Sequence, residues 1–397
     1  MKNFKRFLIV VICIAICGIV AFSLITIETK DVVQSAPPLV PEKKDAAIEI
    51  PVDTFYNNIT QLIGGNDTLL SYNKKWDANK IKTYTKNVNS KTKRIEGNRL
   101  MPLMEWNKLN LERNNIADSS FAFYPFSGGD FIHLNWLYPN ADEYLLVARE
   151  AVGSVPNLLN KNTDYVTGYL NDIDYVLRDI YSKSYFITKN MSADTKVDTQ
   201  VNGMLPVILW AVARTNHEVL SLTYKQIDEN GVAVDADSSV KKPSAVEISI
   251  RHKTSNKIKK VTYLSCDISD YGFNLKPSNL TFLTNKIPSN CNSFIKSASY
   301  LLHYNSFQKI REFILNKSKF LVQDDTGIPF KYFNSETWTG ELFGTYVLPV
   351  KDFSENLFQN DLLSAYKSEK YKGSLTFSLG YHWGGQNRQN QMVFIKH

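Results

Sequence analysis

The pattern of apolar and polar positions is most regular between residues 121 and 156. Residues 121–126 form an apolar and aromatic run, which is typical of a buried strand. Turn residues follow at 127–130, and residues 131–138 then suffice for about two turns of helix, which ends before a proline. Residues 143–150 form a second, nearly continuous apolar run, as strands buried on both faces do. This stretch therefore predicts a βαβ unit with a glycine-rich turn.

The segments on either side of this unit alternate between helix and strand patterns. Mostly helical segments span residues 55–115 and 158–220, and a further helix is predicted at 306–315. Alternating residues predict an antiparallel hairpin at 245–266 and a closing hairpin at 374–395. Together these elements predict one α/β fold. We expect a three-layer, Rossmann-like sheet of the methyltransferase type, mostly parallel, with an antiparallel C-terminal hairpin and added helices.

The N-terminal charge pattern is that of an exported protein. Residues 1–6 carry three basic side chains, and 21 uncharged residues follow at 7–27, the length of a bilayer-spanning helix. A cleaved signal peptide and a lipoprotein attached through Cys17 are the alternatives. Each keeps the positive end in the cytoplasm and places the rest outside it. We therefore expect a cytoplasmic tail at 1–6, a transmembrane anchor or signal at 7–27, a proline-containing linker at 28–53 and a single extracytoplasmic α/β domain at 54–397.

Basic side chains concentrate in one part of the chain. The formal net charge is +7 over 397 residues, and residues 74–94 hold eight lysines and arginines against the single acid Asp77. Such a segment suits contact with anionic lipid or acidic glycan, and the alternative is a solvated helix face. We find no nucleic-acid-binding module, and the expected location argues against that partner.

The glycine-rich turn is the first candidate for a binding site. Ser127, Gly128, Gly129 and Asp130 separate the first strand from its helix, and Glu150 lies 22 residues after Gly128. This is close to the spacing of about 20 residues at which a Rossmann unit places its ribose-binding acid. The full GxGxxG pattern is missing, and Asp130 would repel a phosphate, so an adenosine-type ligand fits better than a dinucleotide. The alternative is a tight structural turn in which Asp130 caps the helix.

A second group of acids follows a later strand pattern. Residues 320–322 lead into Asp324 and Asp325. If this strand is parallel to the βαβ strands, its carboxyl end meets theirs at one edge, where ligands bind in open α/β sheets. Asp130, Glu150 and these two acids would then bind a hard cation such as Mg²⁺ or Ca²⁺, or act as an acid–base pair. The alternative is that each carboxylate caps a helix or stabilises a turn.

The cysteines and histidines were searched for a disulfide, a zinc motif and a catalytic residue. Cys266 and Cys291 are the only cysteines outside the N-terminal apolar segment, so export predicts a disulfide between them, with two buried free thiols as the alternative. The histidines show no HxxxH or HxH spacing, so no zinc motif is visible. Lys296, Ser299 and His303 would face one way on a helix, but this pattern alone does not identify a catalytic residue.

Three groups of residues carry a resemblance. They are YPFSGGDF at 124–131, KSASYLLHY…IREFIL…QDDTGIPF between 296 and 330, and GYHW at 380–383. These are similar to motifs of an uncharacterised family of bacterial secreted or membrane-anchored proteins, over the chain from Trp76 to the C-terminus. The resemblance implies one folded unit and transfers no activity.

The sequence thus indicates a membrane-tethered extracytoplasmic protein whose Rossmann-like domain binds a small molecule, a glycan or an envelope partner without catalysis. The alternative is an enzyme that uses carboxylates at the carboxyl edge of the sheet, as a metal-assisted hydrolase or a methyltransferase-like transferase. No cofactor is identified. Adenosylmethionine and nucleotides are scarce outside the cytoplasm, which favours the binding role.

Overall fold

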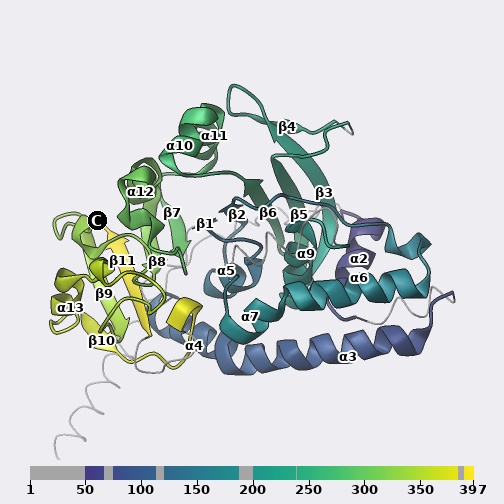
Figure 1. Cartoon of the computed structure of the whole chain (residues 1–397), viewed down its shortest axis with the longest axis horizontal. Helices are drawn as coiled ribbons and strands as arrows, with labels where there is room; N and C mark the ends of the chain where they lie inside the picture. Colours follow the sequence, from purple (N-terminus) through teal and green to yellow (C-terminus); the bar gives the residue numbers. More distant parts are fainter. Residues whose placement is uncertain (1–49, 67–74, 113–119, 187–199, 238, 383–388) are drawn as a thin grey trace, which may run out of the picture. The chain divides into compact units, whose positions relative to one another are not determined.

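A computed structural model describes residues 50–66, 75–112, 120–186, 200–237, 239–382 and 389–397 (Figure 1). The expected tail at 1–6, the apolar segment at 7–27 and most of the linker lie outside the described residues. Within the described part, no helix is both long and apolar enough to cross a membrane. Residues Ile50–His397 make up one compact unit, and the description below concerns that unit.

In the described residues, eleven strands form one sheet in the order β10-β9-β11-β8-β7-β1-β2-β6-β5-β3-β4. Their bounds are β1 Phe121–Pro125, β2 Glu143–Ala148, β3 His217–Ile227, β4 Ala233–Asp235, β5 Ala245–His252, β6 Ile258–Ser265, β7 Cys291–Ile295, β8 Ser318–Gln323, β9 Trp338–Gly344, β10 Tyr371–Gly373 and β11 Asn390–Lys396.

The centre of the sheet is parallel and its flanks are mostly antiparallel, although the outermost strand β10 pairs in parallel with β9. Strands β6, β2, β1, β7 and β8 pair in parallel. On one flank β5, β3 and β4 continue from β6 in antiparallel pairing, and on the other β11 pairs antiparallel with both β8 and β9. The predicted mostly parallel sheet is therefore wrong, because antiparallel pairing joins more residues than parallel pairing does. The fold is a mixed α/β fold.

Two of the predicted strand pairings are confirmed and one is wrong. The parallel pairing of β1 with β2 across the helix α5 (Phe131–Leu137) confirms the βαβ unit, and β5 and β6 form the expected hairpin. The closing hairpin does not form, because β11 lies between β8 and β9 and pairs with both. Residues 374–381 therefore find no free edge of β11 to pair with.

Helices cover both faces of this sheet (Figure 1). Alternate residues of β1 and β2 point to opposite faces, so Tyr124 and Leu146 join one core while Phe123 and Leu145 join the other. The first core includes residues of α2 Thr54–Ile63, α3 Ala78–Ile95, α4 Met101–Asn110, α5, α6 Thr163–Val176, α7 Arg178–Lys183 and α9 Leu205–Arg214. The second includes residues of α10 Asp270–Leu275, α11 Pro277–Lys286, α12 Gln308–Lys317 and α13 Asn360–Ala365.

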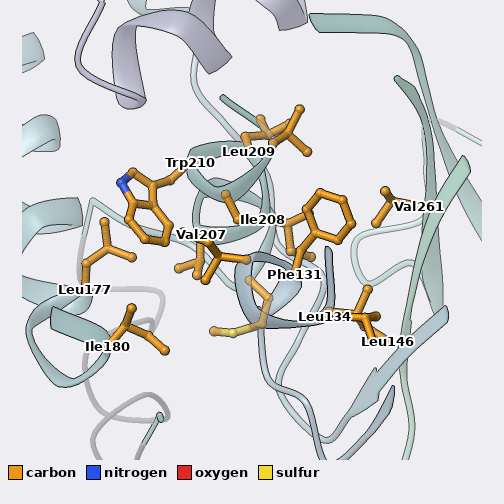
Figure 2. Packing of buried hydrophobic residues seen from close by; sticks show 14 of the residues in the cluster. Phe131, Leu134, Leu146, Leu177, Ile180, Val207, Ile208, Leu209, Trp210 and Val261 are labelled. Carbon is orange, nitrogen blue, oxygen red and sulfur yellow. The ribbon is translucent and has the colours of Figure 1, made fainter. Parts of the chain in front are cut away.

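Helix α9 lies at the centre of the first core, between α5 and α7 (Figure 2). Its sequence LPVILWAV is apolar on every side, as a helix surrounded by protein requires, and all eight residues are buried. Val207 of this helix also fixes the glycine turn. A Cβ added at Gly129 would lie 2.8 Å from Val207 Cγ1, so only glycine allows α9 to pack this closely.

Candidate functional site

A cavity of about 560 Å³ opens at the carboxyl ends of the central parallel strands. The loops that follow β1, β2, β6 and β7 each contribute to its wall, at 126–128, 148–150, 266–268 and 296–299. Strands β1 and β7 are neighbours here, and their connections leave in opposite directions along the sheet. Ligands bind at this kind of position in open α/β sheets.

The predicted glycine turn forms part of this wall. Ser127, Gly128 and Asp130 line the cavity, whereas Gly129 faces α9. Gly128 has φ +53°, a left-handed conformation that glycine adopts without strain. Ser127 Oγ lies 3.0 Å from the carbonyl oxygen of Gly128 and 3.3 Å from that of Val147, which ties the turn to β2.

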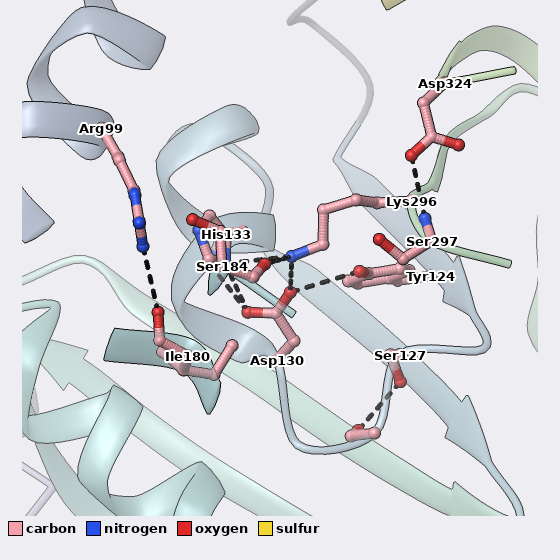
Figure 3. A network of polar contacts seen from close by, with 11 residues as sticks. Arg99, Tyr124, Ser127, Asp130, His133, Ile180, Ser184, Lys296, Ser297 and Asp324 are labelled. Atoms are coloured by element: carbon pink, nitrogen blue, oxygen red, sulfur yellow. Dashed lines mark hydrogen bonds and ion pairs between the residues drawn. The ribbon is translucent and has the colours of Figure 1, made fainter. Parts of the chain in front are cut away.

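Asp130 lies at the floor of the cavity and is only 2% exposed. Figure 3 shows its contacts with Tyr124, His133 and Lys296. Its Oδ1 accepts from the backbone N–H of His133 at 3.4 Å, so it caps α5, as the structural alternative predicts. The same oxygen lies 2.7 Å from His133 Nδ1, and Oδ2 lies 2.5 Å from Lys296 Nζ and 3.2 Å from the hydroxyl of Tyr124. Lys296 also donates to the carbonyl oxygen of Ser184. The carboxylate is thus both a helix cap and one half of a buried ion pair.

The charges at this floor depend on one another. Burial tends to raise the pKa of Asp130, but the adjoining His133 and Lys296 hold it below its usual value. Burial lowers the pKa of Lys296 against the opposing charge of Asp130, and burial together with Lys296 lowers the pKa of His133. We assign a carboxylate, an ammonium and a neutral imidazole. From the sequence, the charge of Asp130 is expected to repel a phosphate at this turn. Lys296 compensates that charge.

Two carboxylates lie at the ends of adjacent strands in the cavity wall. Glu150 follows β2 and Asp267 follows β6. The backbone carbonyl of Glu150 accepts from the hydroxyl of Tyr263 at 2.7 Å, which fixes that loop. Asp267 Oδ1 accepts from the N–H of Ser269 at 3.0 Å, and Oδ2 lies 3.7 Å from Arg149 Nε. Both acids line the cavity.

Sequence reasoning identified Glu150 and missed Asp267. The signal was present, since an acid directly follows the hairpin predicted at 245–266. It was overlooked because residues 245–266 read as an antiparallel hairpin away from the site. In the structure β6 pairs antiparallel with β5 and also parallel with β2, and the second pairing brings Asp267 to the cavity.

Asp324 and Asp325 are at the carboxyl end of β8, but neither lines the cavity. Asp324 Oδ2 accepts from the N–H of Ser297 at 3.0 Å, and Oδ1 accepts from the N–H of Thr326 at 3.0 Å. Asp325 Oδ2 accepts from the hydroxyl of Tyr300 at 2.5 Å. Both carboxylates are buried, and they hold the loop after β7 in place.

The chain after β7 forms a loop and not the expected helix. The expectation that Lys296, Ser299 and His303 face one way on a helix is therefore wrong. Ser297, Ser299 and Tyr300 have φ between 54° and 56°, which a helix does not contain. Lys296 turns toward Asp130, while Ser299 Oγ lies 2.6 Å from the hydroxyl of Tyr381. The lysine and the serine therefore do not form a nucleophile pair.

The expected disulfide is also wrong, because Cys266 and Cys291 are free and buried. Cys266 follows the carboxyl end of β6, whereas Cys291 begins β7, and strands β2 and β1 lie between them. Three strand spacings of about 4.8 Å exceed the reach of a disulfide, whose Cα atoms lie roughly 4.4–6.8 Å apart.

Among the residues that the structure describes, no group of three or more histidine, cysteine or acidic side chains is arranged to hold a metal ion. Comparison with protein-family models, with curated proteins and with solved structures gives no significant match to this chain.

Proposed function

We propose that residues 50–397 form a Rossmann-like domain of the methyltransferase type that binds a nucleoside-containing small molecule. Strand order supports the fold. We count only β1, β2, β6, β7, β8, β9 and β11 and treat β3, β4, β5 and β10 as additions to the fold. Renumbered in chain order, the spatial order β6-β2-β1-β7-β8-β11-β9 then becomes 3-2-1-4-5-7-6. This is the Rossmann order 3-2-1-4-5-6 with one antiparallel strand inserted between the last two, which is the methyltransferase arrangement.

The position of the cavity carries the proposal of ligand binding. It lies at the point where the strand order reverses, between β1 and β7, and the glycine turn lets a ligand approach the backbone there. Its volume of about 560 Å³ is within the range of roughly 300–1,000 Å³ that is usual for small-molecule sites.

The acids of the wall support a nucleoside as the ligand class. Glu150, at the end of β2, occupies the place of a ribose-binding acid. Asp267, at the end of the next strand, adds an acceptor for an amine or a further hydroxyl. The apolar side chains of Phe126, Ile268 and Phe307 line the same cavity and suit the faces of a base. A nucleoside satisfies all three features with one molecule.

Isothermal titration of the purified full-length chain with adenosine and with S-adenosylhomocysteine tests the proposal. We expect binding by the wild-type protein and weaker binding by Glu150→Gln and by Asp267→Asn. Glu229→Gln is the matched control, because Glu229 is exposed in the turn between β3 and β4 and does not line the cavity. Affinity that is unchanged in both cavity variants contradicts the assignment.

A transferase is the second candidate, and the strand order favours it. Such an enzyme would transfer the methyl group of S-adenosylmethionine from sulfur to a nucleophile on the second substrate, leaving S-adenosylhomocysteine and a proton. Formation of S-adenosylhomocysteine by the full chain in the presence of candidate acceptors distinguishes this function from binding alone.

The proposed setting is a tether through residues 7–27, with the domain outside the cytoplasm. The basic residues at 1–6 and the uncharged segment after them support this topology. Protease added to cells with opened outer envelopes should digest the domain, and protection of the domain contradicts the topology.

A further inference from the structure

The far wall of the cavity is aromatic. Tyr185, Phe353 and Tyr381 come from three different segments and all line the cavity. The ring centroids of Tyr185 and Tyr381 are 4.6 Å apart at an interplanar angle of 64°, and those of Phe353 and Tyr381 are 5.3 Å apart at 63°. Ser299 Oγ and the hydroxyl of Tyr381 share a hydrogen bond of 2.6 Å. Neighbouring rings thus present their faces in different directions.

The charge of the cavity is opposite to that of the chain. The chain carries a net charge of +7. The cavity, however, is lined by four carboxylates and two basic side chains: Asp130, Glu150, Asp267 and Asp352, with Arg149 and Lys296. Asp130 and Lys296 compensate one another at the floor. A cleft lined by excess negative charge attracts cations and concentrates them.

Asp352 supplies that charge beside the aromatic wall. It directly precedes Phe353 and lines the same cavity. After burial and Tyr381, the charges of Asp179 and Asp352 help raise the pKa of Tyr185 to about 12. Asp352 also contributes to the raised pKa of Tyr381, whose first cause is burial. Asp352 is exposed, and it shares the cavity wall with both tyrosines.

We propose that Tyr185, Phe353, Tyr381 and Asp352 form a subsite for an organic cation, a quaternary or alkylated ammonium group. Aromatic faces attract such a cation through their quadrupoles, and they do so more strongly when water is excluded. The carboxylate adds an attraction that a neutral apolar group does not gain. The subsite shares the cavity with the proposed nucleoside but uses different residues.

The test uses no nucleoside, so its outcome is independent of the proposed function. Choline, tetramethylammonium and 3,3-dimethylbutan-1-ol, the neutral isostere of choline, are titrated into the full-length protein and followed by ligand-observed NMR. We expect both cations to bind and the neutral isostere to bind at least about tenfold more weakly. Equal affinity for choline and its isostere overturns the proposal, because it leaves only apolar contact.

Four variants assign the effect to these residues. Asp352→Asn should weaken the binding of choline several-fold. Glu355→Gln should not, because Glu355 is an exposed acid three residues further along the chain that does not line the cavity. Tyr381→Leu should weaken the affinity for choline by about tenfold. Tyr381→Phe, which keeps the ring, should bind choline nearly as the wild type does. A thermal melt of each variant identifies any loss of folding. If Tyr381→Phe, correctly folded, loses as much affinity as Tyr381→Leu, the hydroxyl and not the ring is responsible, and the proposal is overturned.

Discussion

Lys296 Nζ lies 2.5 Å from Asp130 Oδ2, although 166 residues separate the two in the chain. Lys296 directly follows β7, and Asp130 is the N-cap residue of α5 after the glycine turn. The same ammonium group donates to Ser184, at the end of α7. One buried cation therefore joins three segments and fixes the floor of the cavity.

Removal of that cation should destabilise the domain strongly. Lys296→Met leaves the Asp130 carboxylate buried without its partner, which typically costs about 3–5 kcal/mol. Urea unfolding of the variant measures the loss, and Lys82→Met, at an exposed lysine of α3, is the control. The double variant Asp130→Asn/Lys296→Met should lose less than the two single variants together, since they remove opposite halves of one pair. A loss below about 1 kcal/mol in Lys296→Met would show that the pair contributes little.

Acid should destabilise the domain through His217, which is 1% exposed. Burial, with the nearby charges of Lys259 and His252, lowers the pKa of His217 to about 3. The unfolded chain, with a histidine pKa of about 6.5, therefore binds more protons than the folded state between these values, and stability falls as pH drops through this window. In His217→Gln the free energy of unfolding should depend less on pH between about 6.5 and 4. His397→Gln, at the exposed C-terminal residue, is the control, and equal slopes in all three proteins contradict the prediction.

Two glycines should respond oppositely to the same substitution. Gly153 has φ +73°, and a Cβ there would lie 1.7 Å from the carbonyl oxygen of Asn202. Gly153→Ala should therefore cost at least about 2 kcal/mol through strain and overpacking. Within the described residues, a Cβ at Gly97 meets nothing within 4 Å. Gly97→Ala should be neutral or stabilise by up to about 1 kcal/mol in the same unfolding assay. Similar losses in both variants would contradict the packing at Gly153.

The thiols of Cys266 and Cys291 should be free and unreactive in the folded protein. Burial raises the pKa of Cys266 to about 12 and that of Cys291 to about 11, so little thiolate is available at neutral pH. Alkylation without reductant, followed by peptide mapping, should label both residues after denaturation and neither before it. A peptide that joins the two cysteines contradicts the strand order between β6 and β7.

Local patterns predicted local structure well. The apolar runs around the glycine turn identified β1, α5 and β2, because the apolar residues within each run are enough to mark a buried element. The antiparallel hairpin of β5 and β6 followed from alternation. Sheet order did not follow, because the place of β11 between β8 and β9 depends on pairing across long stretches of chain that leave no local signal.

The site was predictable only where its residues follow the first strands. Glu150 and the glycine turn are within one βαβ unit, so their spacing indicated a shared wall. Asp130 was read as a ligand or a cap, and its partner Lys296 was out of reach of any spacing rule. The aromatic wall joins Tyr185, Phe353 and Tyr381 from three loops, and no periodicity connects such residues.

The most direct test of the proposed function is a cycle that combines one change in the protein with one in the ligand. Affinities of wild-type protein and Glu150→Gln for adenosine and for 2′,3′-dideoxyadenosine are measured by isothermal titration. If Glu150 accepts the ribose hydroxyls, the wild type should prefer adenosine by more than about tenfold, and the variant should bind both ligands with nearly equal affinity. The same preference in both proteins, or no binding of adenosine to the wild type, contradicts a nucleoside site at the carboxyl edge of this sheet.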